Sequence, residues 1–413
     1  MRILVAHNRY QQAGGEDAVF ENEAAMLEDA GHEVHRYEVH NDDIVSVPDK
    51  VRTFLTTPYS RKAHKRFDDA LRKIDPDVVH IHNYFPLLTP AVFYACADHG
   101  IPVVHTLHNF RMMCANGLLL RDGQVCKKCV SGSPFLAVAH RCYRDSFEGS
   151  LAVARMISAQ RRWHTWHNAV TRFIALTQFE RKTFIEAGIP DDKIRIKPNF
   201  VSDPGVHNDV PPLERSGALF VGRLSGEKGL RTLVDAWREV PVPLRIAGDG
   251  PLLDEIRATA PANVTLLGRL PSEQVHSEMS RAALLMMPSN WYEGFPVTLV
   301  EAFACGLPVA ASHIGSLQEL IKDGQNGFSF EPGNADDLAR TVRRALSQPN
   351  RLAKMSAAAR ACYDKGYTID RNIEMLESVY REACATMGSG ATSSAASDAV
   401  VHSWARPPAP SEG

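Results

Sequence analysis

Short apolar runs alternate with amphipathic stretches along most of the chain, and this alternation constrains the fold more than any other feature of the sequence. It is typical of βαβ units, in which helices connect parallel strands and cover the sheet. The first half predicts strands at residues 3–7, 33–39, 78–82, 103–108 and 173–176, and helices at about 18–30, 63–73, 90–99 and 151–170. The second half predicts strands at 219–221, 244–247, 264–267, 284–288 and 309–311, each followed by a helical stretch. We therefore expect an α/β protein with two doubly wound halves and a crevice between them.

The length of the chain also favours two domains, because one core rarely grows beyond about 250 to 300 residues and the chain has 413. Proline, glycine and aspartate cluster near residues 196–205, where the periodicity stops. We place the boundary there, between a domain of residues 1–197 and a domain of residues 198–366. A helical stretch follows at 367–387. The Gly/Ser/Ala/Pro-rich residues 388–413 are expected to be disordered, since this composition cannot bury a core.

Composition and charge exclude several classes of protein. The net charge of −2 gives no reason to expect a nucleic-acid partner. The sequence has no run of about 18 apolar residues that could span a bilayer, and its first residues enter a strand without the cleavage site of a signal peptide. We expect a cytoplasmic protein whose eight cysteines are reduced unless they bind a metal ion.

Two glutamates, Glu293 and Glu301, flank what reads as the start of a helix, with Pro296 suited to the first helical position. The free N–H groups of a helix start bind phosphate, and carboxylates can accept hydrogen bonds from hydroxyls. Phosphate beside hydroxyls suggests a nucleotide sugar. Two solvated glutamates on an ordinary helix are the alternative.

A strand, turn and helix at residues 218–230 place Arg223 and Lys228 in one loop. Two fixed cations beyond the end of a strand can neutralise a diphosphate without a metal ion. Each cation could instead be solvated. Together with the Gly248–Gly250 turn and the glutamate pair, in this order, they indicate a diphosphate site.

In the first half, Gly14 and Gly15 follow the first strand, where glycine lets the backbone approach a ligand closely, and an ordinary βα turn is the alternative. Four histidines lie at later strand ends, and they are His80, His82, His105 and His108. Ligands bind beyond the carboxyl ends of parallel strands, so His108 is the best candidate, although histidines often only satisfy a core. A Gly-x-Gly-x-x-Gly fingerprint does not follow the first strand, which counts against a dinucleotide oxidoreductase.

The chain resembles the GT-B glycosyltransferases, in particular the retaining family 4, over nearly its whole length to about residue 387. The matching pieces are Gly14-Gly15, Gly222-Arg223 with Glu227-Lys228-Gly229, residues 247–251, the Glu-x7-Glu pair and residues 323–327. The resemblance implies two Rossmann-like domains that face a central cleft. Residues 1–197 would bind the acceptor and residues 198–366 the nucleotide sugar, and the helix at 367–387 would pack back on the first domain.

The resemblance also implies roles for the site residues. Arg223 and Lys228 would carry the diphosphate charge, Glu293 and His108 would contact the donor sugar, and Glu301 would bind the ribose. The remaining positions would frame the phosphates, the sugar and the base, and they are Gly14, Gly15, Gly222, Leu270, Gly294, Phe295, Pro296 and Val297.

The implied reaction moves a sugar from a nucleoside-diphosphate sugar to a hydroxyl of a glycan or lipid-linked acceptor, with retention of configuration. It requires no cofactor and no protein nucleophile. The family favours bacterial surface polysaccharide or glycolipid synthesis. A GT-B sugar-nucleotide epimerase and a non-catalytic GT-B scaffold stay open as alternatives.

Two further features lie outside these motifs. The cysteine-rich insert at about residues 112–143 contains Cys114, Cys126, Cys129 and Cys142. Four thiolates can complete a tetrahedral zinc shell, so a structural zinc site is one interpretation, and unligated thiols or disulfides are the others. Residues 151–170 combine arginines with Trp163 and Trp166. This helix could rest on the inner face of an anionic membrane, or it could be an ordinary surface helix.

Overall fold

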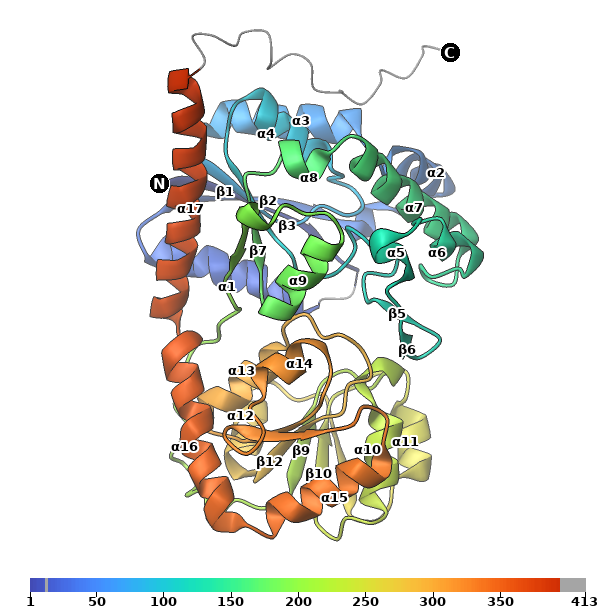
Figure 1. Ribbon diagram of the computed structural model, residues 1–413, viewed down its shortest axis with the longest axis vertical. Helices are drawn as coiled ribbons and strands as arrows, with labels where there is room; N and C mark the ends of the chain where they lie inside the picture. Colours follow the sequence, from blue (N-terminus) through green and yellow to red (C-terminus); the bar gives the residue numbers. More distant parts are fainter. Residues whose placement is uncertain (12–13, 394–413) are drawn as a thin grey trace.

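The computed structural model of the protein describes residues 1–11 and 14–393, with side chains described to residue 387. The chain forms two α/β domains, one above the other in Figure 1, each built on a parallel sheet of six strands. This confirms the predicted GT-B architecture of two Rossmann-like domains. Within the described ranges, none of the helices is both long and apolar enough to cross a bilayer.

The first sheet has the order β2-β1-β3-β4-β7-β8. Its strands are β1 (Arg2–Arg9), β2 (Glu33–His40), β3 (Val78–Asn83), β4 (Val103–Thr106), β7 (Arg172–Ala175) and β8 (Ile194–Ile196). All six residues of β3 are buried, as expected for a strand covered on both faces. The surrounding helices are α1 (Gly15–Asp29), α2 (Val47–Thr56), α3 (Arg61–Ile74), α4 (Ala91–Asp98), α7 (Phe147–Arg162), α8 (Thr165–Asn168) and α9 (Gln178–Glu186).

The second sheet has the order β11-β10-β9-β12-β13-β14. Its strands are β9 (Ala218–Val221), β10 (Leu244–Ala247), β11 (Val264–Gly268), β12 (Leu284–Met287), β13 (Val309–Ser312) and β14 (Gly327–Phe330). The helices of this domain are α10 (Leu230–Trp237), α11 (Leu253–Thr259), α12 (Ser272–Arg281), α13 (Val297–Ala304), α14 (Gly315–Leu320), α15 (Ala335–Leu346) and α16 (Pro349–Gly366).

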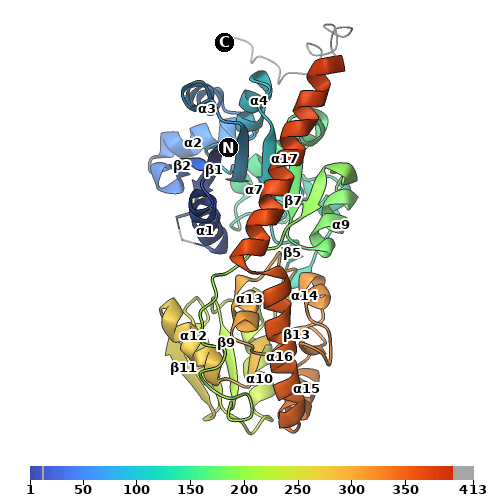
Figure 2. The ribbon, with the colours of Figure 1, turned by 90° about the vertical axis from the view of Figure 1, so that its left-hand side faces the viewer.

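The last helix, α17 (Ile369–Ser393), leaves the second domain and runs along the first, as Figures 1 and 2 show. It contacts β3, β4 and α1. Its side chains Leu376, Val379 and Tyr380 are buried in a core cluster that also contains residues of both sheets. The helix continues to Ser393, six residues beyond the predicted end at 387, and residues 394–413 lie outside the described residues.

The helix predicted at residues 151–170 differs from the expectation at both ends. The helix predicted at 151–170 begins earlier, at Phe147, where the Ser146 side chain accepts a hydrogen bond from the N–H of Gly149 and caps it. It ends at Arg162, because His164 adopts a left-handed conformation that breaks the helix before α8.

The predicted insert lies between β4 and α7. It contains the short hairpin of β5 (Leu120–Arg121) and β6 (Gln124–Val125), followed by α5 (Lys128–Ser131) and α6 (Leu136–Ala139). The guanidinium of Arg161 on α7 donates hydrogen bonds to the carbonyls of Cys129, Val130 and Gly132 at 2.7 to 2.8 Å. These bonds fix the CxxC segment to the first domain.

Candidate active site

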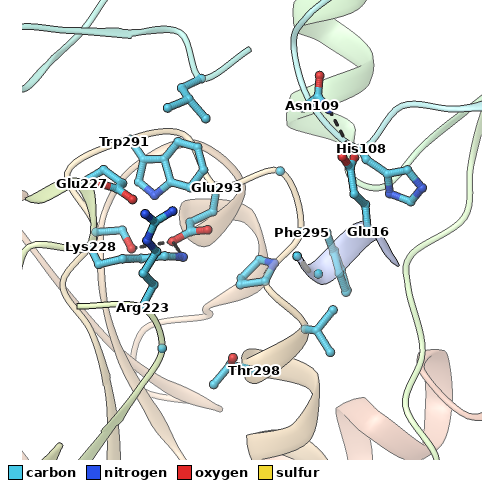
Figure 3. A pocket seen from close by; sticks show the side chains of 18 of the residues that line it. Glu16, His108, Asn109, Arg223, Glu227, Lys228, Trp291, Glu293, Phe295 and Thr298 are labelled. Atoms are coloured by element: carbon cyan, nitrogen blue, oxygen red, sulfur yellow. Dashed lines mark hydrogen bonds and ion pairs between the residues drawn. The ribbon is translucent and has the colours of Figure 1, made fainter. Parts of the chain in front are cut away.

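A cavity of about 1130 Å³ lies between the two domains, beyond the carboxyl ends of strands from both sheets. This is where ligands bind in open α/β folds. Most of the residues singled out in the sequence line it, namely Gly14, Gly15, His108, Gly222, Arg223, Lys228, Glu293, Gly294, Phe295, Pro296 and Val297. Figure 3 labels His108, Arg223, Lys228, Glu293 and Phe295 among them. The structure thus brings the cationic loop and the acidic segment together.

The cationic loop follows β9 and holds Lys228 against the segment after β12. Gly229 has a φ of 71°, and a Cβ there would lie 1.8 Å from the carbonyl oxygen of Pro288. Only glycine allows this close approach. As a result, the ammonium of Lys228 lies 2.6 Å from Oε1 of Glu293 and over the ring of Trp291. Arg223 is exposed on the same wall of the cavity (Figure 3).

Glu293 is 5% exposed, so its carboxylate needs hydrogen-bond and ion-pair partners in place of water. Ser289 donates a hydrogen bond of 2.7 Å to the oxygen that also contacts Lys228. The sequence predicts that Glu293 binds a sugar and Lys228 a diphosphate, whereas in this structure the two residues contact each other. A ligand with a phosphate beside hydroxyls could replace this contact. The phosphate would bind Lys228, and a hydroxyl would donate a hydrogen bond to Glu293.

The start of α13 is close to the other domain. Pro296 is the N-cap and Val297 the first helical residue, so the prediction that Pro296 is the first helical residue is wrong by one position. A Cβ on Gly294 would lie 2.7 Å from Oε1 of Glu180 and 3.3 Å from the carbonyl oxygen of His108, both in the first domain. Gly294 therefore permits the approach of the two domains.

Two predicted residues, Glu301 and Leu270, do not line this cavity. Glu301 lies on α13, with Oε1 3.6 Å from Nε2 of His276 on α12. Leu270 lies in the turn between β11 and α12 and is half-buried. Both residues belong to the second domain, and neither is part of the cavity wall.

The first domain contributes polar groups that the sequence reasoning missed. Asn109 donates a hydrogen bond of 3.2 Å to Oε2 of Glu16, and both residues line the cavity (Figure 3). Burial raises the pKa of Glu16. Glu16 directly follows Gly15, and Asn109 directly follows His108. Their position next to predicted site residues was the signal in the sequence that could have identified them. Further lining residues that were missed are Tyr10, Arg111, Asn116, Gly117, Leu118, Arg144, Ser289 and Trp291.

Of the four candidate histidines, His108 lines this cavity. His80, His82 and His105 are almost fully buried behind it. Nε2 of His108 lies 3.0 Å from Nδ1 of His82. Burial lowers the pKa of His108 well below its usual value and lowers the pKa of His105 to about 4, so both rings are neutral at pH 7. Neutral imidazoles donate from one nitrogen and accept at the other.

All four cysteines of the insert are free thiols. Cys114 is buried in the core of the first domain, and the others are half-buried. Burial, followed by the nearby thiols of Cys114, Cys142 and Cys126, raises the pKa of Cys129 to about 11. A possible metal site needs at least three side chains with ligand atoms within 4.8 Å of one another. Across residues 1–11 and 14–387, Glu23, His80 and His82 meet this condition, and the cysteine sulfurs do not.

Two family models together cover most of the chain. The model described as glycosyltransferase family 4 matches residues 13–203, and the model described as glycosyl transferases group 1 matches residues 210–361. The two matches are separated in the linker between β8 and β9, where the chain passes from one sheet to the other.

Several relatives with similar sequences are glycosyltransferases. An uncharacterized glycosyltransferase of Methanocaldococcus jannaschii is 23% identical over 92% of this chain and 98% of its own length. The D-inositol 3-phosphate glycosyltransferase of Catenulispora acidiphila is 26% identical over 75% of this chain and 73% of its own. The 2-deoxystreptamine glucosyltransferase of Streptomyces kanamyceticus is 35% identical over 56% of this chain and 65% of its own.

Solved structures share the fold. Sucrose-phosphate synthase from Thermosynechococcus elongatus superposes with a TM-score of 0.67 at 18% identity, covering 93% of this chain and 100% of that one. Anabaena HepE in complex with UDP gives 0.61 at 19% identity, covering 92% and 99%, and a complex of HepE with UDP-glucose is also similar. Together with the family models, these likenesses show that the chain belongs to the GT-B glycosyltransferases of the family 4 type and is a glycosyltransferase.

Proposed function

We propose that the protein transfers a sugar from a nucleoside-diphosphate sugar to a hydroxyl acceptor with retention of anomeric configuration. The observation that carries this proposal is the contact of Lys228 with Glu293 in the interdomain cavity, with Arg223 exposed beside them. A diphosphate needs two cations and a sugar needs hydrogen-bond acceptors, and this wall offers both. The complexes of HepE with UDP and UDP-glucose support a donor of this class.

In the transfer step, negative charge develops on the leaving diphosphate. Arg223 and Lys228 would stabilise this charge by electrostatic interaction. Such stabilisation is usually the largest single contribution to catalysis. Once Lys228 turns to the phosphate, Glu293 is free to accept hydrogen bonds from sugar hydroxyls. The leaving phosphate assists attack from the same face, so this chain supplies no nucleophile and no cofactor takes part in catalysis.

The acceptor would enter from the wall of the first domain, opposite the donor. Glu16, Asn109 and Arg144 line this wall, and Asn116 reaches it from the insert. Such a mixed surface suits a polyhydroxylated acceptor, whose hydroxyls can donate to the carboxylate and accept from the amides. We favour a glycan or lipid-linked acceptor in bacterial surface polysaccharide or glycolipid synthesis.

We further propose a cytoplasmic protein in peripheral contact with the inner face of the membrane, through α2 rather than through residues 151–170. Of the two tryptophans in residues 151–170, Trp166 is only 5% exposed and Trp163 is half-buried, so this segment offers little apolar surface to a bilayer. On α2, by contrast, Val47, Val51 and Leu55 are 71%, 52% and 58% exposed. The same helix exposes basic side chains, which are attracted to anionic lipids. Co-sedimentation with phosphatidylglycerol vesicles should be lost in Leu55→Asp, whereas unchanged binding would contradict the role of α2.

The cysteine insert is proposed to hold a structural zinc ion. Four thiols lie in one short segment that Arg161 ties to the first domain, and thiolates are preferred zinc ligands. Cys114, Cys126, Cys129 and Cys142 would be the ligands. Closing the shell requires side-chain rotations, because the sulfurs are not gathered within 4.8 Å of one another in the described part of the chain. A closed four-thiolate site would stabilise the insert and take no part in catalysis.

The decisive test is incubation with UDP-, GDP- and ADP-sugars, with and without candidate acceptors. A transferase releases nucleoside diphosphate, and its release increases with the right acceptor. An epimerase would instead change the sugar of the nucleotide sugar without an acceptor. If none of these donors changes the thermal stability of the protein or is turned over, the donor proposal is wrong and a scaffold role is favoured.

A further inference from the structure

A line of buried polar side chains runs from His108, in the cavity wall, into the first domain. Nδ1 of His82 lies 3.0 Å from Nε2 of His108, and the two ring planes are within 20° of each other with centroids 5.2 Å apart, which suits a hydrogen bond between the two nitrogens. Behind them, Nε2 of His82 lies 3.5 Å from Oε2 of Glu23. The other oxygen of Glu23 contacts the ammonium of Lys197, which also donates a 2.8 Å hydrogen bond to Asn372 of α17.

The cluster behind His108 is charge-balanced and is unsuited to a metal ion. Glu23, His80 and His82 have ligand atoms within 4.8 Å of one another. However, Lys197 and Glu23 are both 0% exposed and form an ion pair. A metal cation bound to Glu23 would face this ammonium in a buried environment, where like charges repel strongly. The lysine therefore already supplies the positive charge that the carboxylate requires.

Two buried atoms in this line have no hydrogen-bond partner within the described residues, and they face each other. They are Oε2 of Glu23 and Nε2 of His82. The neighbouring His80 is already satisfied, with Nδ1 2.8 Å from the hydroxyl of Tyr380 and Nε2 2.7 Å from the hydroxyl of Thr106. Because buried polar groups are almost always paired, a slight rotation that closes the 3.5 Å gap is strongly favoured.

The direction of this hydrogen bond decides the state of both histidines. An ionised carboxylate only accepts, so Nε2 of His82 must carry the proton and Nδ1 of His82 must be the acceptor. Nε2 of His108 then donates to His82. This leaves Nδ1 of His108 without a proton, and Nδ1 is the ring nitrogen that is not turned toward His82.

We propose that Glu23, acting through His82, sets the tautomer of His108, so that Nδ1 of His108 is a hydrogen-bond acceptor for a hydroxyl of the bound sugar. Glu23 and His82 are positioning residues, since neither lines the interdomain cavity. The proposal rests on the proposed role of His108 in donor binding. Its first consequence, the tautomer, can be measured without any donor.

The tautomers can be read by NMR of the full chain labelled with 15N in histidine, with His82→Asn and His108→Asn used to assign the signals. Two-bond 15N–1H correlations distinguish the two neutral forms. We expect protonated Nε2 and unprotonated Nδ1 in both His82 and His108. A proton on Nδ1 of His108 in the unsubstituted protein overturns the proposal, whatever the activity.

Glu23→Gln should reverse the direction of the hydrogen bonds that link position 23, His82 and His108. Lys197 donates to one side-chain oxygen at position 23, so the glutamine oxygen will face Lys197 and its NH₂ group will face His82. Nε2 of His82 then accepts, Nδ1 of His82 donates, and the proton of His108 moves to Nδ1. We expect this shift together with a fall in turnover of about tenfold, which corresponds to the loss of one neutral hydrogen bond.

Tyr380→Phe is the matched control, because it removes a hydrogen bond from His80 in the same buried cluster and leaves the Glu23–His82–His108 line intact. It should change neither the His108 tautomer nor turnover by more than about twofold. Equal effects of both substitutions would reduce Glu23 to a structural role and overturn the proposal. If Glu23→Gln does not fold, the tautomer of the unsubstituted protein still decides. An absence of turnover with every donor, with the expected tautomer present, would refute the proposed function instead.

Discussion

Replacement of Glu180 by glutamine is expected to stabilise the protein in alkaline solution. Glu180 lies on α9 and is fully buried. Its Oε2 accepts a hydrogen bond of 2.8 Å from the N–H of Leu176, and Oε1 has no partner among the residues that the structure describes. Burial, and to a smaller extent the nearby Glu319 carboxylate, raises the pKa of Glu180 to about 8. The side chain is therefore protonated in the folded protein at neutral pH.

The pH dependence follows from the difference between the folded and unfolded states. The pKa of Glu180 is about 8 in the folded protein and 4.5 in the unfolded chain. The contribution of Glu180 to stability is therefore complete below about pH 4.5 and is lost as the pH rises to about 8. At about 1.4 kcal/mol for each unit by which the pKa is raised, the loss is on the order of 5 kcal/mol once the group is ionised. Glutamine does not ionise and can keep the hydrogen bond from Leu176, so it avoids this loss.

Thermal and urea unfolding of both proteins between about pH 5 and about pH 9 measures the effect. The stability of Glu180→Gln relative to the unsubstituted protein should increase steadily up to about pH 8 and then level off. Glu186→Gln, an exposed position on the same helix, is the control and should show no such trend. A constant difference between Glu180→Gln and the unsubstituted protein over the whole range would refute the reasoning.

Three further predictions concern the site and the insert. Lys228→Ala should reduce turnover about 100-fold or more, because the diphosphate loses a cation, whereas Arg231→Ala, which removes an exposed ion pair with Glu255, should leave turnover nearly unchanged. Gly294→Ala should also reduce turnover at least tenfold, since its Cβ would lie 2.7 Å from Oε1 of Glu180 and 3.3 Å from the carbonyl oxygen of His108, so the Glu180 side chain and the cavity wall have to shift; comparable kcat/KM to the unsubstituted enzyme would contradict this steric role. Elemental analysis should find about one zinc per chain, lost together with several degrees of thermal stability in Cys126→Ser, and a metal-free protein of unchanged stability would remove the zinc proposal.

Much of the fold could be predicted because buried parallel strands have a local signature. In β3 every residue is buried, and its sequence is an apolar run with two histidines. The meeting of Lys228 with Glu293 could also be predicted, because both residues follow strand ends, and neighbouring strands of a parallel sheet end at the same edge. Local pattern and fold topology were sufficient in these cases.

Other features lacked a local signal. The strand β8 is only three residues long, too short for its periodicity to be recognised. The exposed valines and leucine of α2 alternate with polar residues as they would on a buried face, so the sequence alone cannot tell the two apart. Glu23 and Lys197 are 174 positions apart, and a buried ion pair at such a separation is visible only after the chain has folded.

Contacts between the domains decide whether the two walls of the cavity act as one site. Glu319 of the second domain accepts hydrogen bonds of 3.0 and 2.8 Å from the N–H groups of Gln178 and Phe179, at the start of α9 in the first domain. A carboxylate is stabilising at a helix N-terminus, and here the two belong to different domains. The second domain alone could still pair Lys228 with Glu293, but it would lack the wall that contains His108. Under the proposed function, one domain alone would bind the diphosphate, whereas sugar transfer would require the contacts that hold both domains together.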